Sequence, residues 1–415
     1  MIGTSNRSVS KDLNSKAQTI LSKLIAFPVL GGESNNSIAD WIENYLTEHG
    51  VSFHNVFNEE GNKRSIHCRI GPAVDGGVVL SGHTDVVPVA GQDWHSEPFK
   101  MIEKEGKLYG RGTCDMKGFI ACCLACLPEM LAADLKKPIY FAFSYDEEIG
   151  CWAGHALAKS IMDTYVEKPR FAIIGEPSEM EVVTGQKGMG TIETTITSRG
   201  AHSSKIYTEA SAVHEGAKLV VWLENRMEEL IKSGKSDKRF TPPHSTLHVG
   251  MFNGGIAHNI VADKCTIVWD LRTLPRDDSA TIINEFKAYC AERMAIMRKK
   301  VPNFNITSKE RFPLVVPLDT PNDAPIVKFV QQLTDNKVIN AVSFASEAGQ
   351  FAAEGFEAVI CGPGSIEQAH RANEFIEIDQ MEKGITFMRE LIRVCLLYTS
   401  PSPRDATLSR MPSSA

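Results

Sequence analysis

Acidic residues and histidines recur in five short segments of this chain, and each segment also contains glycine or proline. The segments contribute, in chain order, His83 and Asp85 from SGHTDVVP, Asp115 from GRGTCDMKG, Asp146, Glu147 and Glu148 from SYDEEIG, Glu176 from IGEPS, and His370 from GPGSIEQAHRANE. Imidazole nitrogens and carboxylate oxygens bind borderline and hard divalent cations. These side chains therefore predict a cation site with nitrogen and oxygen ligands and without sulfur.

Two histidines and three carboxylates are enough ligands for two cations of the Zn²⁺, Co²⁺ or Mn²⁺ type. One carboxylate must then bridge the ions, because two-metal hydrolases hold their ions ~3.5–4 Å apart. Bound cations lower the pKa of water, and a further carboxylate that is not a ligand can accept and return a proton. The predicted chemistry is metal-assisted hydrolysis.

Each residue taken alone has an ordinary structural interpretation. A single histidine in a loop is more often structural than a ligand. Asp115 precedes a predicted helix and can be its N-cap residue, and Glu176, before Pro177, can cap the next helix. Glu147 and Glu148 can be a solvated charge pair. The functional interpretation depends on all five segments meeting at one place.

The elements around these segments predict that they meet. Buried strands are expected over Gly77–Ser81, Ile139–Ser144, Phe171–Ile174 and Ala358–Cys361, where short apolar runs occur. An apolar repeat at helical spacing predicts a helix over Asp115–Leu131. Alternating strands and helices indicate an α/β domain with a central mixed sheet, and ligands of open α/β sheets bind beyond the carboxyl ends of the strands.

The pattern changes after about Gly185 and predicts a second domain. The expected order is a strand, a helix, two strands, a helix and a strand, over Thr191–Ser198, Glu209–Ile231, Ser245–Phe252, Val261–Arg272, Asp278–Lys299 and Asn305–Arg311. On the first helix, Val213, Ala217, Val220, Met227 and Ile231 are expected to share the buried face. This order is typical of a ferredoxin-like α+β unit. We expect it over residues 187–313, inserted into a discontinuous domain of residues 1–186 and 314–397.

Composition excludes several classes of protein. The 415 residues include 44 Lys and Arg against 51 Asp and Glu, a net charge of −7, which argues against nucleic acid as a partner. No apolar run reaches the ~20 residues of a membrane span, and the first residues lack the apolar region of a secretion signal, so we expect a cytoplasmic protein. Its ten cysteines are expected to be free thiols. The Ser- and Pro-rich tail, 398–415, is expected to be disordered and is compatible with a non-native addition.

The five segments resemble the M20 family of metallopeptidases and deacylases. SGHTDVVPV-GQ-W, GRGTCDMKG, DEE-GC, GEPS and GPGS---AH--NE match in order, and with the inserted domain the resemblance covers about residues 12–395. Within the family, SGHTDVVPVAGQDWHSEPF and GPGSIEQAH are most similar to the enzymes that remove the acetyl group from N2-acetyl-L-ornithine. The resemblance implies an amidohydrolase with two divalent ions, Zn or Co, and a small N-acyl amino acid as substrate.

The resemblance also implies a role for each residue of the predicted cluster. Asp115 bridges the ions, His83 and Glu176 complete one site, and Glu148 and His370 complete the other. Glu147 is the general base and later the general acid. Asp85 orients the imidazole of His83.

The inserted domain corresponds to a lid and dimerisation module in this family, which implies a homodimer. His202, in GAHSS, corresponds to a histidine that reaches the active site of the partner subunit and stabilises the oxyanion. Asn259 and Arg272 correspond to substrate-binding residues, and Arg272 would bind the substrate carboxylate. The alternation of the strand supports this placement, since Ile267, Trp269 and Leu271 share one face and Val268, Asp270 and Arg272 the other.

Several alternatives remain open at this stage. A succinyl-diaminopimelate desuccinylase, or a dipeptidase or aminoacylase of the same family, would use the same cluster. An inactive relative that keeps the metals is a further alternative, against which the presence of Glu147 argues. GQKGMG at Gly185–Gly190 and Ser346-Glu347 depart from the forms expected in the deacetylases, and Glu347 is a candidate to meet the cationic end of ornithine.

Overall fold

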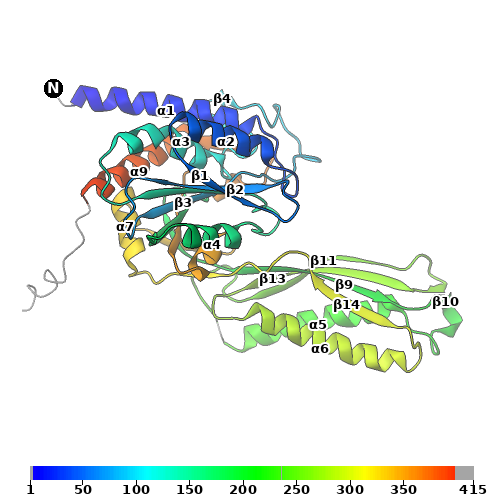
Figure 1. Cartoon of the computed structure of the whole chain (residues 1–415). Coiled ribbons are helices and arrows are strands. Elements are labelled where there is room, and N and C mark those ends of the chain that lie inside the picture. The colour runs from blue at the N-terminus through cyan, green and yellow to red at the C-terminus, as the bar shows by residue number, and fades with distance from the viewer. Residues whose placement is uncertain (1–2, 235, 398–415) are drawn as a thin grey trace, which may run out of the picture.

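The structure is a computed structural model that describes residues 3–234 and 236–397. Figure 1 shows a large unit, with a broad sheet between helices, and a small unit that extends away from it. The small unit comprises residues 188–310, and the large unit comprises the described residues on either side of it. The expectation for the 398–415 tail lies outside the described residues. None of the described helices combines the length and apolar character that a membrane crossing requires.

The large unit is built on a nine-stranded mixed sheet. Its strands lie in the order β1 (Phe53–Phe57), β2 (Arg64–Ile70), β6 (Ile139–Ser144), β3 (Val78–His83), β7 (Phe171–Ile174), β17 (Glu357–Ile360), β8 (Val182–Gln186) and β15 (Leu318–Asp319), with β16 (Ile339–Val342) also paired to β8. The four strands β6, β3, β7 and β17 are parallel neighbours. Their carboxyl ends therefore lie at the same edge of the sheet, as the sequence predicts.

Helices cover both faces of this sheet (Figure 1). One face packs against α1 (Gly3–Ile25), α2 (Asn36–Glu48), α3 (Lys117–Ala132), α7 (Pro325–Thr334) and α9 (Ile378–Leu397), and the other against α4 (Gly154–Thr164) and α8 (Ala348–Ala353). Along β6, Phe141 and Phe143 face the first layer and Tyr140 and Ala142 the second. A strand buried on both faces reads as a continuous apolar run, which explains why these strands are visible in the sequence.

Short elements complete the large unit. A three-stranded sheet consists of β18 (Phe375–Glu377), β5 (Lys107–Tyr109) and β4 (Ile102–Lys104). The 3₁₀ turn η2 (Ile366–Gln368) lies between β17 and β18. This arrangement places the segment around His370 beside the segment that leads into α3, because β18 pairs with β5.

The small unit has the predicted order of elements. Its antiparallel sheet runs β11 (Thr246–Gly254), β13 (Lys264–Thr273), β9 (Gly188–Thr197) and β14 (Asn305–Glu310), covered on one face by α5 (Ala212–Lys232) and α6 (Ser279–Arg298). A two-stranded sheet of β10 (Ala201–His202) and β12 (Ile260–Val261) extends it. Ile267, Trp269 and Leu271 are buried under the helices, as their alternation predicts.

The buried face of α5 differs from the prediction. The buried residues are Ala212, Glu215, Gly216, Leu219 and Leu223, whereas Ile231 is 46% exposed. The reason is that the face contains a buried acid and a glycine, which an apolar repeat does not reveal. The Glu215 carboxylate pairs with Arg293 of α6. A Cβ at Gly216 would lie 2.9 Å from Cys265 Sγ of β13, so glycine allows the helix its close approach to the sheet there.

Candidate metal centre

The cluster residues come from neighbouring strand ends of the large sheet. His83 is the last residue of β3, Glu147 and Glu148 lie in the loop that follows β6, and Glu176 lies in the loop that follows β7. Since β3 pairs in parallel with both β6 and β7, these side chains emerge at one edge. Asp115 joins them from the segment before α3, where Lys117 is the first helical residue.

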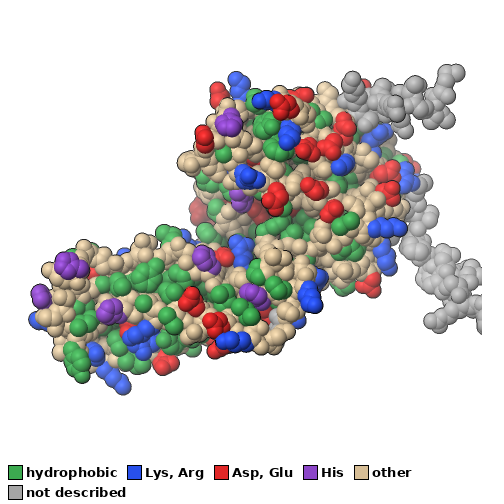
Figure 2. Space-filling view, turned by 180° about the vertical axis from the view of Figure 1, so that it is seen from behind, with side chains coloured by type: hydrophobic (Ala, Val, Ile, Leu, Met, Phe, Trp, Pro, Cys, Tyr) green, Lys and Arg blue, Asp and Glu red, His purple; other side chains and the backbone are tan. Residues whose placement is uncertain are grey.

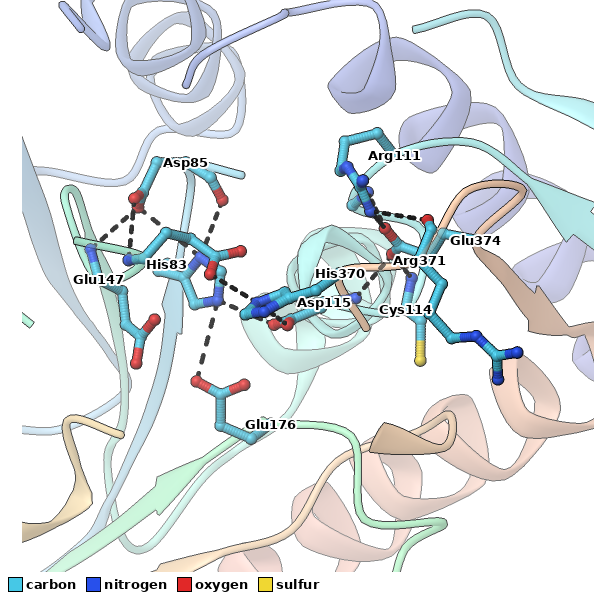
Figure 3. A network of polar contacts seen from close by, with 12 residues as sticks. His83, Asp85, Arg111, Cys114, Asp115, Glu147, Glu176, His370, Arg371 and Glu374 are labelled. Atoms are coloured by element: carbon cyan, nitrogen blue, oxygen red, sulfur yellow. Dashed lines mark hydrogen bonds and ion pairs between the residues drawn. The ribbon is translucent and has the colours of Figure 1, made fainter. Parts of the chain in front are cut away.

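The structure brings the five predicted ligand residues together, and Figure 3 labels His83, Asp115, Glu176 and His370 among them. His83 Nε2 lies 3.1 Å from Asp115 Oδ1 and 3.8 Å from Glu176 Oε1. His370 Nε2 lies 3.4 Å from Asp115 Oδ2 and 2.8 Å from Glu148 Oε2. The two oxygens of Asp115 therefore face two different histidines, which is the arrangement a bridging carboxylate requires.

The local contacts exclude the ordinary interpretations of the acids. The N-cap position of α3 is Met116, so Asp115 does not cap this helix. The next element after Glu176 is a strand, β8, and not a helix. The Glu148 side chain is 4% exposed, which is inconsistent with a solvated charge pair. Each acid is therefore buried without the structural role that its type most often has.

Asp85 fixes the acidic segment as well as the imidazole. His83 Nδ1 lies 2.9 Å from the main-chain oxygen of Asp85 and 3.7 Å from its carboxylate. The Asp85 carboxylate accepts hydrogen bonds of 3.2 Å from the main-chain N–H groups of Glu147 and Glu148. Its closest contact with the imidazole is thus made by the peptide oxygen, while its carboxylate positions the two glutamates.

Asp146 holds the same segment from the other side. One of its oxygens accepts a hydrogen bond of 2.8 Å from Gly32 N, and the other pairs with the buried Lys63 ammonium. Its φ of 55° is uncommon for a residue with a side chain. The ion pair and the hydrogen bond keep this conformation in place, so Asp146 is the structural acid of the DEE run.

Burial and like charge dominate the electrostatics. Burial, together with the neighbouring carboxylates, raises the pKa of Glu176 and of Glu147 well above the ordinary value and that of Glu148 to about 7. Burial also acts to raise the pKa of Asp115, but hydrogen bonds from His370 and His83 outweigh it and lower that pKa. The hydrogen bond to Asp115 raises the pKa of His370 to about 10. The positive charge beside the buried carboxylates of the cluster therefore comes from the two histidines, and a bound cation would add the positive charge that these carboxylates lack.

These residues fit a pair of divalent cations. His83 with Glu147 and Glu176 forms one group whose ligand atoms lie within 4.8 Å of one another, and His83 with Asp115 and Glu148 forms a second. Glu176 Oε1 is buried and has no hydrogen-bond partner. Such an atom costs free energy unless a cation or an ordered water satisfies it. The donor set contains no sulfur, which suits Zn²⁺, Co²⁺ or Mn²⁺.

The site opens to solvent on one side. The His370 side chain is 58% exposed, whereas that of His83 is 1% exposed. Solvent therefore reaches the cluster at His370. Glu347 is 1% exposed, and one of its carboxylate oxygens has no partner. Its predicted contact with a cationic substrate end stays a prediction.

The structure does not bring the three residues of the small unit to the cluster. Figure 1 places β10, which carries His202, at the end of the small unit that is remote from the large sheet. Asn259 lies beside it, because its main-chain oxygen accepts a hydrogen bond of 2.9 Å from Ser203 N. Arg272 is next to the last residue of β13, and its guanidinium pairs with Asp270 of the same strand at 3.0 Å.

Sequence reasoning missed two buried residues that join the segments of the cluster. Glu374 and Arg111 each have a side chain 1% exposed and pair at 2.8 Å. Both stand in the quoted segments, GRGTCDMKG and GPGSIEQAHRANE. The only sign of them in the sequence is that an arginine and a glutamate stand close to the predicted ligands. Charged residues at the surface give the same pattern.

Comparison with known proteins gives one family. A family model described as peptidase family M20/M25/M40 matches residues 79–394. Acetylornithine deacetylase of Proteus mirabilis (strain HI4320) is 30% identical over 380 residues, which cover 89% of this chain and 94% of that protein. Acetylornithine deacetylase of Shigella sonnei (strain Ss046) is 32% identical over 319 residues, 76% of this chain and 79% of that protein.

Solved structures share the fold. An M20 family metallo-carboxypeptidase from Sulfolobus solfataricus superposes with a TM-score of 0.74 at 18% identity, covering 92% of this chain and 100% of that one. A tripeptidase from Staphylococcus aureus gives 0.71 at 19% identity, covering 93% and 99%. A dinuclear metal binding peptidase of the M20 family from Bacillus subtilis gives 0.60 at 13% identity, covering 93% and 99%. At these identities the likeness concerns the fold.

Proposed function

This chain belongs to peptidase family M20/M25/M40 and is a metal-dependent hydrolase, and from this premise we propose that it removes the acetyl group from N2-acetyl-L-ornithine. The products are acetate and L-ornithine. The curated relatives of that name support this substrate. The observation that carries the hydrolytic part of the proposal is the surplus of acids in the cluster: Glu147 lies with His83 and Glu176 in one group of possible ligands, beside a second group of His83, Asp115 and Glu148.

We propose that His83 and Glu176 would hold one ion and Glu148 and His370 the other, and that Asp115 would be shared by both. When bound, the two ions supply Lewis acidity and lower the pKa of the attacking water. Glu147 accepts a proton from this water and later passes it to the leaving amine. The Glu147 carboxylate lies within 4.8 Å of ligand atoms of His83 and Glu176, so it can reach a water held at the cluster.

The small unit, predicted over 187–313, serves in this proposal as a lid and dimerisation module. Figure 2 shows hydrophobic side chains on its surface, and Met251, Phe252, Ile256 and Ile260 are 39–81% exposed there. β11 is an edge strand of the small sheet, with unpaired backbone groups that a second copy can cover. A homodimer would explain both features.

In such a dimer, β10 of one subunit would lie close to the cluster of the other subunit. His202 of the partner subunit would donate a hydrogen bond to the developing oxyanion, which is typically the largest electrostatic contribution to acyl transfer. Asn259 lies beside His202 and would contact the substrate from the same side. Arg272 would bind the α-carboxylate by a charge-assisted hydrogen bond.

A substrate panel tests the proposal. The metal-loaded protein is assayed with N2-acetyl-L-ornithine, N-succinyl-diaminopimelate and a glycine dipeptide, each with Zn²⁺ and with Co²⁺. We expect the highest kcat/KM for acetylornithine. Preference for the succinyl substrate or the dipeptide would replace the substrate while keeping the class of reaction. Absence of hydrolysis with all three would contradict the proposal.

A further inference from the structure

A single buried carboxylate holds the segment that carries Asp115. Glu374 Oε1 accepts hydrogen bonds from Cys114 N at 2.9 Å and Asp115 N at 3.1 Å, and its Oε2 accepts one from Gly112 N at 2.9 Å. The Arg111 guanidinium donates a fourth bond, of 2.8 Å, to Oε2. Three main-chain N–H groups of the segment Gly112–Asp115 are therefore oriented by one side chain, which lies 259–262 residues away in the sequence (Figure 3).

The same arginine holds the segment that carries His370. Arg111 donates to the main-chain oxygen of Arg371 at 3.2 Å, and Gln92 Nε2 donates to the main-chain oxygen of His370 at 2.8 Å. Arg111 also donates to the side-chain oxygen of Gln92. His370 has a φ of 62°, a left-handed conformation that a residue with a side chain adopts only when its surroundings impose it.

We propose that Glu374 and Arg111 are positioning residues that set the separation between Asp115 and His370 and thereby the affinity for the ions. The inference rests on the metal assignment of the proposed function. Apart from the ion pair between them, the hydrogen bonds of these two side chains go to main-chain atoms of the two segments and to Gln92, and none goes to a side chain of the cluster. Outer residues of this kind orient ligands, and their loss typically costs about 10–100-fold in metal affinity.

Glu374→Gln is the direct test. The amide keeps the shape of the side chain but replaces one acceptor by an NH₂ group, which would face main-chain N–H donors or the guanidinium. Metal affinity is measured by calorimetric titration of the metal-free full chain with Zn²⁺ and with Co²⁺, and thermal unfolding is followed in parallel. Glu377→Gln is the matched control, because Glu377 lies nearby on β18 with a side chain 49% exposed.

We expect Glu374→Gln to bind metal roughly 10–100-fold more weakly than the wild type and to recover turnover at high free metal, with Glu377→Gln unchanged. Metal affinity within twofold of the wild type in a folded Glu374→Gln protein would overturn the proposal. This readout needs no substrate, so it is independent of whether acetylornithine is hydrolysed.

Gln92→Leu keeps the test decisive should Glu374→Gln fail to fold. Gln92 is only half-buried, and the substitution removes its bond to the His370 oxygen and the bonds that its own oxygen accepts from Arg111 and Trp94, while leaving Glu374 in place. We expect weaker binding of one ion of the two, because His83 and Glu176 are untouched. Equal weakening of both ions, or of neither, would contradict the positioning role.

Discussion

The Nε2 atom of His83 lies 3.1 Å from an oxygen of Asp115, while its Nδ1 lies 2.9 Å from the main-chain oxygen of Asp85. The peptide oxygen can only accept, so it keeps a proton on Nδ1. In the neutral imidazole the lone pair is then on Nε2, on the side of the carboxylates, as a metal ligand requires. The contact with the Asp85 peptide oxygen therefore makes Nε2 the nitrogen of His83 that can bind a cation.

Glu147→Gln is expected to lower kcat by about 10²–10⁴-fold, the usual contribution of a general acid–base group. The amide keeps the shape of the side chain but cannot accept a proton from water. Metal content, measured by atomic spectroscopy, should stay at two ions per chain. Loss of an ion in this variant would instead show that Glu147 is a metal ligand. Its carboxylate lies within 4.8 Å of ligand atoms of His83 and Glu176, so the experiment distinguishes the two roles. Glu33→Gln, at an exposed position, is the control.

His202→Ala is expected to lower turnover without changing metal content, because β10 is remote from the cluster. Mixing His202→Ala with Glu147→Gln gives a sharper test. Subunits that exchange would form mixed dimers in which one site has Glu147 and receives His202 of the partner subunit. Up to about a quarter of wild-type activity should return, since half of the dimers are mixed and each has one intact site.

Two outcomes would contradict that arrangement. No recovery on mixing, although gel filtration shows mixed dimers, would mean that His202 does not act across the interface. Loss of metal in His202→Ala would mean that the residue belongs to the cluster of its own chain.

His67 predicts a pH dependence of stability. Burial, with His54 nearby, lowers the pKa of His67 from 6.5 to about 4, and its ring contacts the Tyr165 hydroxyl and Ser160 Oγ, both at 3.1 Å. Between these values the unfolded chain binds more protons than the folded one, so stability falls as the pH drops below about 6.5. From pH 7 to pH 5 the loss due to this residue is about 2 kcal/mol.

Urea unfolding at pH 7 and pH 5 measures this contribution. His67→Gln should lose less stability between the two pH values than the wild type, by up to that amount. His54→Gln serves as the control, because it changes the neighbouring ring without removing the buried one. An unchanged pH dependence in His67→Gln would refute the assignment.

The ends of the parallel strands could be predicted from the sequence, whereas the buried polar contacts between distant segments could not. The proximity of His83, Asp115 and Glu176 could be predicted, because buried strands appear as apolar runs and parallel strands end at one edge of the sheet. The face of α5 could not be predicted, because Glu215 is stabilised in the core by an ion pair with a residue of another helix. The role of Glu374 depends on hydrogen bonds to main-chain atoms of a distant segment, which leave no pattern in the sequence.

The most direct test of the account is a metal titration of the metal-free protein in which bound ions and acetylornithine hydrolysis are followed together. The account predicts two ions per chain and turnover that rises with occupancy. Asp115→Asn, which removes the carboxylate proposed to be shared by the two ions, should lower both. Full hydrolysis by the metal-free protein, or an Asp115→Asn variant with two tightly bound ions and normal turnover, would contradict the account.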